Sequence, residues 1–96
     1  MDLKNQRQRR KTALITGACS GIGYEFACIF ASENYNLVLV DINERKLIEI
    51  SERFTQEYGI LVKSIAIDLS IAISPEAIYL ELQQASIKVD VLVNNA

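Results

Sequence analysis

Short apolar runs alternate along this chain with segments whose apolar residues recur every three or four positions. The runs are residues 12–16, 36–40, 60–67 and 89–93, and Val, Leu and Ile dominate them. Runs of this length and composition are typical of strands, and a strand buried on both faces of a parallel sheet has no polar side. The pattern therefore predicts four buried strands.

The three intervening segments have helical spacing, and their ends carry fitting residues. Asn34 suits the left-handed position after the first helix, Asn43 can cap the second, and Gly59 can end it. Ser74 followed by Pro75 predicts the cap and first turn of the third. The recurring apolar residues are Ile22, Phe26, Ile29 and Phe30 in the first segment, Leu47, Ile50, Phe54 and Tyr58 in the second, and Ile78, Leu82 and Ala85 in the third.

The resulting order is strand, helix, strand, helix, strand, helix, strand. Strands that alternate with helices of 10–15 residues imply right-handed crossovers and a parallel sheet. We therefore predict an α/β fold with a doubly wound parallel sheet that stops after the fourth strand, over residues 12–96. Residues 1–11 lie outside the alternation.

Composition narrows the class of protein. The chain has 96 residues, half of them apolar, and a formal net charge of −2, so it is one small folding domain or part of a larger one. No apolar run approaches the roughly 18 residues of a membrane span, and the charged start is not a secretory signal. Two cysteines without histidine indicate neither a metal site nor a disulfide framework, so we expect a cytoplasmic location.

The charge is unevenly distributed. Residues 1–11 hold five basic residues and one acid, which gives +4, whereas the remaining residues sum to −6. A basic arm can contact nucleic acid, but chain termini are usually loose and solvated. With an acidic body behind it, we interpret the arm as a solvated extension and expect no nucleic-acid partner.

A glycine-rich turn joins the first strand to the first helix. Its sequence is TGACSGIG, residues 16–23. Such a turn aims backbone N–H groups and the positive end of a helix at one point, which suits a phosphate. Gly17 would permit the sharp turn, Gly21 would let the backbone approach a diphosphate, and Gly23 would let the helix pack closely. A merely tight connection remains the alternative.

The spacing of the glycines separates several phosphate-binding motifs. A P-loop requires Lys after its glycines, and none follows here, so NTP hydrolysis is excluded. The G-x-G-x-x-G dinucleotide fingerprint is not matched either, because this turn reads G-x3-G-x-G.

Asp41 is expected to bind the same ligand as this turn. It closes the second strand eighteen residues after Gly23, where a dinucleotide fold places an acid that accepts hydrogen bonds from the adenosine ribose. A carboxylate there repels a 2′-phosphate, and neither Cys19 nor Ser20 is basic, so we predict NAD rather than NADP. A turn acid is the alternative interpretation.

Taken together, these motifs resemble the short-chain dehydrogenases/reductases over residues 12–96. Thr16-Gly17-x3-Gly21-Ile22-Gly23 matches the T-G-x3-G-x-G of that family. Asp68-Leu69 matches its acid after the third strand, and Asn94-Asn95-Ala96 matches the start of its N-N-A-G motif. The resemblance implies a Rossmann-type fold and the cofactor-binding half of an enzyme.

The resemblance also implies a role for each matching position. Asp68 would bond the adenine amino group, with the backbone of Leu69 beside it, and Ile22 would lie near the nicotinamide. Residues 94–96 would line the cofactor near its ribose and brace the fourth strand, although turn chemistry alone would also explain Asp68 and the two asparagines. Cys19 would be a neutral filler. The expected cofactor-binding residues are Gly17, Cys19, Ser20, Gly21, Ile22, Gly23, Asp41, Asp68, Leu69, Asn94, Asn95 and Ala96.

Catalysis by this family is hydride transfer between a nicotinamide and an alcohol or carbonyl, using Ser and Tyr-x3-Lys. No Tyr-x3-Lys occurs here, so we expect the 96 residues to be inactive alone and the complete protein to form a homo-oligomer. A non-catalytic dinucleotide-binding module is the main alternative. A methyltransferase fits Thr16, the Gly21-Ile22-Gly23 ending and Asn94-Asn95 poorly.

Overall fold

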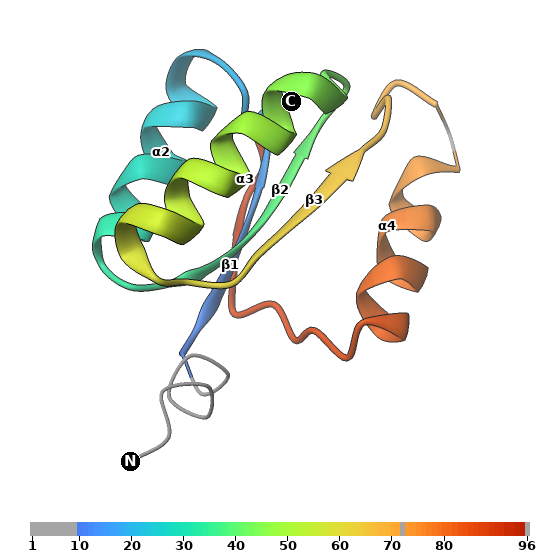
Figure 1. Ribbon diagram of the computed structural model, residues 1–96. Helices are drawn as coiled ribbons and strands as arrows, with labels where there is room; N and C mark the ends of the chain where they lie inside the picture. The colour runs from blue at the N-terminus through green and yellow to red at the C-terminus, as the bar shows by residue number, and fades with distance from the viewer. Residues whose placement is uncertain (1–9, 72, 96) are drawn as a thin grey trace.

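The chain folds as one parallel sheet with helices on both faces (Figure 1). The computed structural model describes residues 10–71 and 73–95, so most of the predicted basic arm and Ala96 lie outside the described residues. In chain order the elements are β1 (Thr12–Thr16), α2 (Gly21–Ser32), β2 (Asn36–Asp41), α3 (Glu44–Tyr58), β3 (Val62–Ala66), α4 (Ser74–Gln84) and β4 (Val91–Val93).

The strands lie in the order β3-β2-β1-β4, and every pair is parallel. The chain therefore moves outward from β1 to β3 and then returns across the sheet to place β4 on the other side of β1. Ile15 lies level with Leu39 on one side and with Val93 on the other. This Rossmann-like arrangement, predicted from the alternation, puts a crevice where the direction of winding reverses, at the carboxyl ends of β1 and β4.

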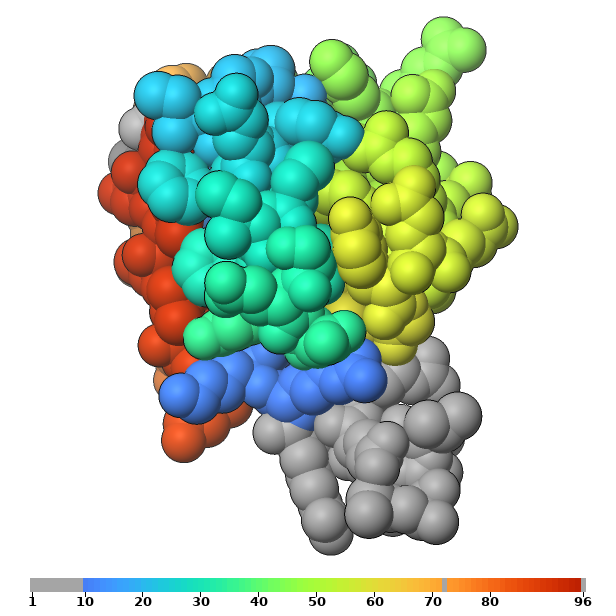
Figure 2. Space-filling model, turned by 90° about the vertical axis from the view of Figure 1, so that its left-hand side faces the viewer, coloured from blue at the N-terminus to red at the C-terminus, as the bar shows by residue number. Residues whose placement is uncertain are grey.

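Alternate strand residues build two cores, because successive side chains point to opposite faces of a sheet. Figures 1 and 2 show α2 and α3 side by side over one face, whereas α4 lies over the other. The continuous apolar runs follow from burial on both sides. The core under α2 and α3 includes Ala13, Ile15, Leu37, Leu39, Leu47 and Phe54, and the smaller core under α4 comprises Leu14, Val38, Val40, Ile65 and Ile78.

The predicted ends of the first two helices are confirmed. Asn34 adopts φ 66° directly after α2, and Gly59 adopts φ 64° at the end of α3. The Asn43 side chain accepts a hydrogen bond from the backbone N–H of Lys46 at 3.1 Å, which makes it the cap of α3.

Two strands begin later than predicted, β3 at Val62 and β4 at Val91. The residues just before them still bond the adjacent strands through their backbones, since the carbonyl oxygen of Leu61 accepts the N–H of Leu37 and the N–H of Asp90 donates to the carbonyl oxygen of Thr12. Side chains add to these bonds: the N–H of Leu61 donates to the Asn36 side chain, and the carboxylate of Asp90 accepts the N–H of Thr12, both at 2.9 Å.

The start of α4 also differs from the prediction. Ser74 is not the cap but the first helical residue, and Ile73 occupies the cap position. The Ser74 hydroxyl is buried and donates to the carbonyl oxygen of Asp68, so it holds the loop before the helix. At the other end Ala85 is exposed rather than part of the inner face.

Of the apolar residues that predicted α2, Phe30 packs against the core, but Ile22, Phe26 and Ile29 are exposed. The helix contacts the sheet through Gly23, Ala27 and Ala31, because small side chains let it approach closely. Ile22 and Ile29 are 61% and 52% exposed. Among the described residues, no helix is both long and apolar enough to cross a bilayer.

Candidate functional site

The glycine turn lies at the reversal of the winding, between β1 and α2. Gly17 and Gly21 have φ values of 63° and 57°, which residues with a Cβ rarely adopt. The backbone conformation thus favours glycine at both positions. An added Cβ on Gly21 would meet nothing within 4 Å, so the turn is open at this point.

Gly23 is required by crowding instead. A Cβ on this residue would overlap the carbonyl oxygen of Gly17 and would lie 2.9 Å from the side-chain nitrogen of Asn95. The first turn of α2 therefore packs directly onto the glycine turn and the end of β4. The close approach predicted for the helix at Gly23 is confirmed, and the helix contacts the glycine turn there.

The start of α2 is electrostatically uncompensated. The Ser20 side chain makes no capping bond, and the first turn of the helix, which the structure describes in full, carries no acid. By contrast, α3 has the Asn43 cap and Glu44, and α4 has Glu76 in its first turn. The helix dipole and free amides at such an end favour an anion.

Asp41 ends β2 beside the turn, and both of its carboxylate oxygens accept backbone N–H groups. Oδ2 accepts from Cys19 at 3.1 Å, and Oδ1 accepts from Asn43 at 3.0 Å. Asp41 is half-buried. Its hydrogen bonds are those of a turn acid, and its place beside the glycine turn is the one expected of an acid in a dinucleotide site. Its position is fixed by bonds to both loops.

Cys19 is enclosed between these loops. It is 4% exposed, and its thiol donates to the backbone oxygen of Asn43 at 3.7 Å. Burial and the Asp41 carboxylate raise the pKa of the thiol to about 11. A thiol that stays protonated is a poor nucleophile, which agrees with its expected role as a neutral filler.

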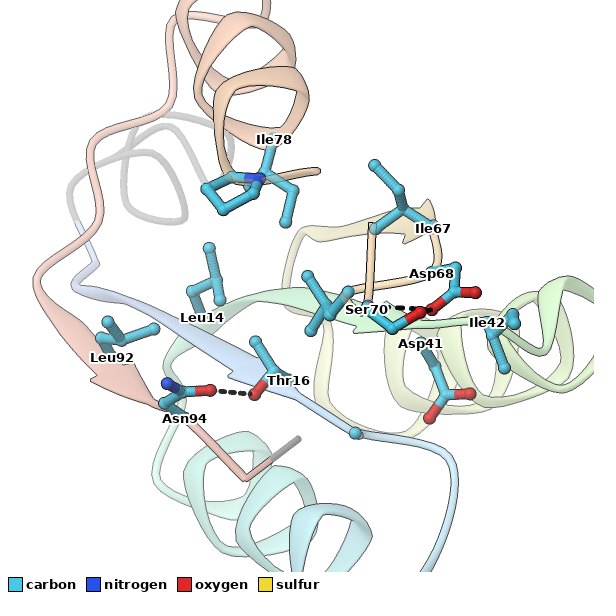
Figure 3. A pocket seen from close by; sticks show the side chains of 13 residues that line it. Leu14, Thr16, Asp41, Ile42, Ile67, Asp68, Ser70, Ile78, Leu92 and Asn94 are labelled. Atoms are coloured by element: carbon cyan, nitrogen blue, oxygen red, sulfur yellow. Dashed lines mark hydrogen bonds between the residues drawn. The ribbon is translucent and has the colours of Figure 1, made fainter. Parts of the chain in front are cut away.

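A cavity of about 750 Å³ lies at the carboxyl ends of the strands. In Figure 3 the carboxylates of Asp41 and Asp68 lie toward one end of it, beside Ile42, with Leu14 and Leu92 toward the other. The side chain and backbone N–H of Ser70 both donate to Asp68 and lower the pKa of its carboxyl. The lining residues are Leu14, Thr16, Gly17, Asp41, Ile42, Ile67, Asp68, Leu69, Ser70, Pro75, Ile78, Leu92 and Asn94.

The hydroxyl of Thr16 ties the end of β1 to the end of β4 (Figure 3). It donates to the Asn94 side chain at 3.0 Å and accepts the N–H of Asn95 at 2.8 Å. This link holds Asn94 at the cavity and Asn95 against the glycine turn. The asparagine pair therefore braces β4, as the resemblance implied.

The structure brings some of the predicted residues to the cavity and leaves others apart. Those that line it are Gly17, Asp41, Asp68, Leu69 and Asn94. The remaining ones belong to the turn and the start of α2 or to the end of β4, and they are Cys19, Ser20, Gly21, Ile22, Gly23 and Asn95.

The sequence interpretation did not include the bonds of Thr16, or Ile42 and Pro75 as lining residues. A signal existed for Ile42, because it directly follows the acid that closes β2. Pro75 lines the cavity because it lies in the first turn of α4, which begins at the same end of the sheet at which β3 ends.

Three comparisons with known proteins bear on this site. The sequence profile of the short chain dehydrogenase family matches residues 11–96. The very-long-chain 3-oxoacyl-CoA reductase of Pyrenophora tritici-repentis is 41% identical over 87 residues, which cover 86% of this chain and 25% of that protein. L-sorbose reductase from Gluconobacter frateurii, complexed with NADPH and L-sorbose, superposes with a TM-score of 0.85 and 33% identity over 91% of this chain and 33% of that one.

Another solved structure holds the other nicotinamide cofactor. A 4-hydroxyisoleucine dehydrogenase complexed with NADH has a TM-score of 0.76 and 28% identity over 91% of this chain and 34% of that one. The present chain spans about a quarter to a third of the length of the curated relatives that it matches.

Proposed function

The chain belongs to the short-chain dehydrogenase family, and on that premise we propose that it is the NAD-binding part of an oxidoreductase. In this proposal residues 12–96 are the N-terminal part of a dinucleotide-binding domain. When bound, the nicotinamide supplies hydride transfer to or from the carbon of an alcohol or carbonyl substrate. We expect this protein to act in the cytoplasm.

The uncompensated start of α2 is the observation that carries the proposal. Three helices are described, and only at α2 are the side-chain cap and the first-turn acid both missing. The glycine turn leads directly into that end, and Gly23 lets the helix pack closely against the turn. This fits a diphosphate, which needs N–H donors and positive potential at close range.

The adenosine end of the cofactor would occupy the cavity beside the turn. Asp41 would accept from the ribose hydroxyls, and Asp68 would accept from the adenine amino group. The hydrogen bonds from Ser70 lower the pKa of the Asp68 carboxyl, which favours the ionised form with both oxygens as acceptors. Apolar side chains such as Ile42 and Leu69 line the cavity and would contact the flat faces of the base.

The preference for NAD rests on Asp41. Its carboxylate lies at the cavity, where a 2′-phosphate would meet its negative charge at short range. The nearby residues of the turn, Cys19 and Ser20, offer no cation. Most of the similar structures that name a bound cofactor hold NADPH or an NADP derivative, and one holds NADH, so the proposed preference for NAD rests on the local charge alone.

The substrate and the catalytic groups belong to the whole protein. The relatives act on ligands as different as a 3-oxoacyl-CoA and L-sorbose, so this region does not identify the substrate. A non-catalytic nucleotide-binding protein would share the same site. A Ser and a Tyr-x3-Lys encoded beyond residue 96 would support the enzyme, and a longer chain without them would support the module.

Isothermal titration of the protein with NAD and with NADP tests the proposal. We expect NAD to bind more tightly, and Asp41→Ala to weaken NAD binding by about 1.5–3 kcal/mol, the value of hydrogen bonds to a charged acceptor. The same variant should discriminate less against NADP, because the repelling charge is gone.

Asp41→Asn is a variant of similar shape that removes the charge. Its single amide oxygen can accept only one of the two backbone N–H groups, of Cys19 or Asn43, that the two carboxylate oxygens accept. We expect it to relax discrimination against NADP with a smaller loss of NAD affinity than Asp41→Ala. A parent protein that prefers NADP would contradict the role given to Asp41.

A further inference from the structure

Another cavity, of about 810 Å³, lies at the end of the sheet opposite the glycine turn. It is bordered by the first residues of β1, β2 and β3 and by residues 85–88, which follow α4. In Figure 1 this is the lower end of the sheet, where the chain passes from α4 to β4. Its volume lies within the roughly 300–1,000 Å³ of small-molecule sites.

The charged residues that line this cavity are mainly basic. They are Arg10, Lys11, Lys63 and Lys88, against the single acid Asp90. The carboxylate of Asp90 already accepts the N–H of Thr12.

The basic side chains differ in their partners. Lys63 lies 3.6 Å from Glu81, and Arg10 donates to the carbonyl oxygen of Gly59 at 3.4 Å. Across residues 10–71 and 73–95, the structure records no ion pair for Lys11 or Lys88. These two ammonium groups therefore lack a carboxylate partner among the described residues.

The walls combine polar and apolar residues. The apolar surface comes from Leu61, which is 43% exposed, and from the half-buried Val62 and Ile87, whereas Leu37 and Val38 are buried behind them. Exposed apolar area of this kind is stabilised when an aliphatic chain covers it. A small inorganic anion would leave these walls wet, and a neutral chain would leave the ammonium groups unpaired.

We propose that this cavity binds a monomeric anionic amphiphile, a single aliphatic chain that ends in a carboxylate. The chain would lie along Leu61, Val62 and Ile87, and the carboxylate would lie between Lys11 and Lys88. The argument is independent of the nucleotide site, because the two cavities lie at opposite ends of the strands.

Titration of the protein with dodecanoate below its micelle concentration tests this site. Amide ¹⁵N–¹H spectra should show shifts at residues 61–63 and 85–88, and the affinity should fall as salt rises, because the head group is held by charge. Acetate and inorganic phosphate should bind at least tenfold more weakly, and dodecyltrimethylammonium should not produce these shifts. Equal binding of the cationic and anionic chains, or shifts confined to other residues, would overturn the proposal.

Two sets of variants test the contact with the carboxylate and the contact with the aliphatic chain separately. Lys11→Gln combined with Lys88→Gln should weaken dodecanoate at least fivefold, whereas Arg45→Gln, an exposed cation on α3, should leave it unchanged. Leu61→Ser alters the apolar wall at a partly exposed position and should weaken dodecanoate without affecting acetate. Dispersed amide spectra would show that each variant folds, and a folded double variant with parent affinity would overturn the proposal.

Discussion

At the scale of single residues, two physical reasons explain the three glycines of the turn. Positive φ favours glycine at Gly17 and Gly21, whereas contact with the turn and with Asn95 requires it at Gly23. Asp41 and Cys19 then fill the space between the turn and the β2–α3 loop. These contacts hold the turn and the β2–α3 loop together on this side of the candidate site.

Cys19 gives a pH-dependent prediction. Burial and the Asp41 carboxylate raise the pKa of its thiol from 9.0 to about 11, so the unfolded chain loses this proton first. The stability linked to this group is complete below pH 9 and is lost as the pH rises toward 11, by at most about 1.4 kcal/mol per pH unit. Urea unfolding at pH 8 and pH 10 should show a smaller loss in Cys19→Ala than in the parent protein.

The comparison of the two proteins removes the contribution of other groups that titrate in this range. Lysines and tyrosines are present in both, so only the difference between the two losses reports on Cys19. Equal losses in parent and variant would mean that the thiol is not desolvated in the folded state.

At the scale of elements, the three helices differ at their starts. Asn43 caps α3, which anchors the larger core through Leu47, Ile50 and Phe54. The start of α2 has no such cap. The cap stabilises the start of α3, whereas the N–H groups at the start of α2 remain available to a ligand.

The cap of α3 gives a prediction about stability. Asn43→Ala leaves the N–H of Lys46 without its acceptor and should lower the free energy of unfolding by about 1 kcal/mol. Asn43→Ser is the matched control, because serine is an equally good cap and should retain most of the stability. Urea denaturation measures both, and an unchanged Asn43→Ala midpoint would show that the cap contributes nothing.

At the scale of the whole molecule, β3 and β4 form the two edges of the described sheet. Among the described strands, β4 pairs only with β1, and Figure 2 shows this end of the chain (red) at the surface beside α2. Leu92 in this strand is 64% exposed. An apolar strand with an open edge is a template for pairing with another chain.

We therefore expect residues 1–96, produced alone, to self-associate through β4. Light scattering at increasing concentration should show species larger than a monomer, and Leu92→Lys should reduce them, because a charge blunts an edge strand. Leu80→Lys is the control, since Leu80 is 55% exposed but lies on α4. A monodisperse monomer at high concentration would contradict this expectation.

Sequence patterns were most reliable where local chemistry decides the conformation. Asn43 and Gly59 end α3 as predicted, because a cap and a left-handed residue act within a few positions. The prediction of Ser74 as the cap of α4 was wrong, because the helix already begins at Ser74 and the hydroxyl of this residue donates to the carbonyl oxygen of Asp68, six residues earlier. The prediction of the inner face of α2 was wrong for most of its residues, because helical spacing does not show which side of a helix contacts the sheet.

By itself, the sequence determined the parallel α/β fold, the positions of the glycine turn and of Asp41, and the family. These follow from periodicity, conformational freedom and motif spacing, all of which are properties of neighbouring residues. The tertiary structure alone decided that Asp41 bonds the turn through Cys19, that Thr16 links β1 to β4, and that α2 packs through its small residues. Contacts between residues 22 to 79 positions apart depend on how the sheet is wound, and no local pattern encodes their distances.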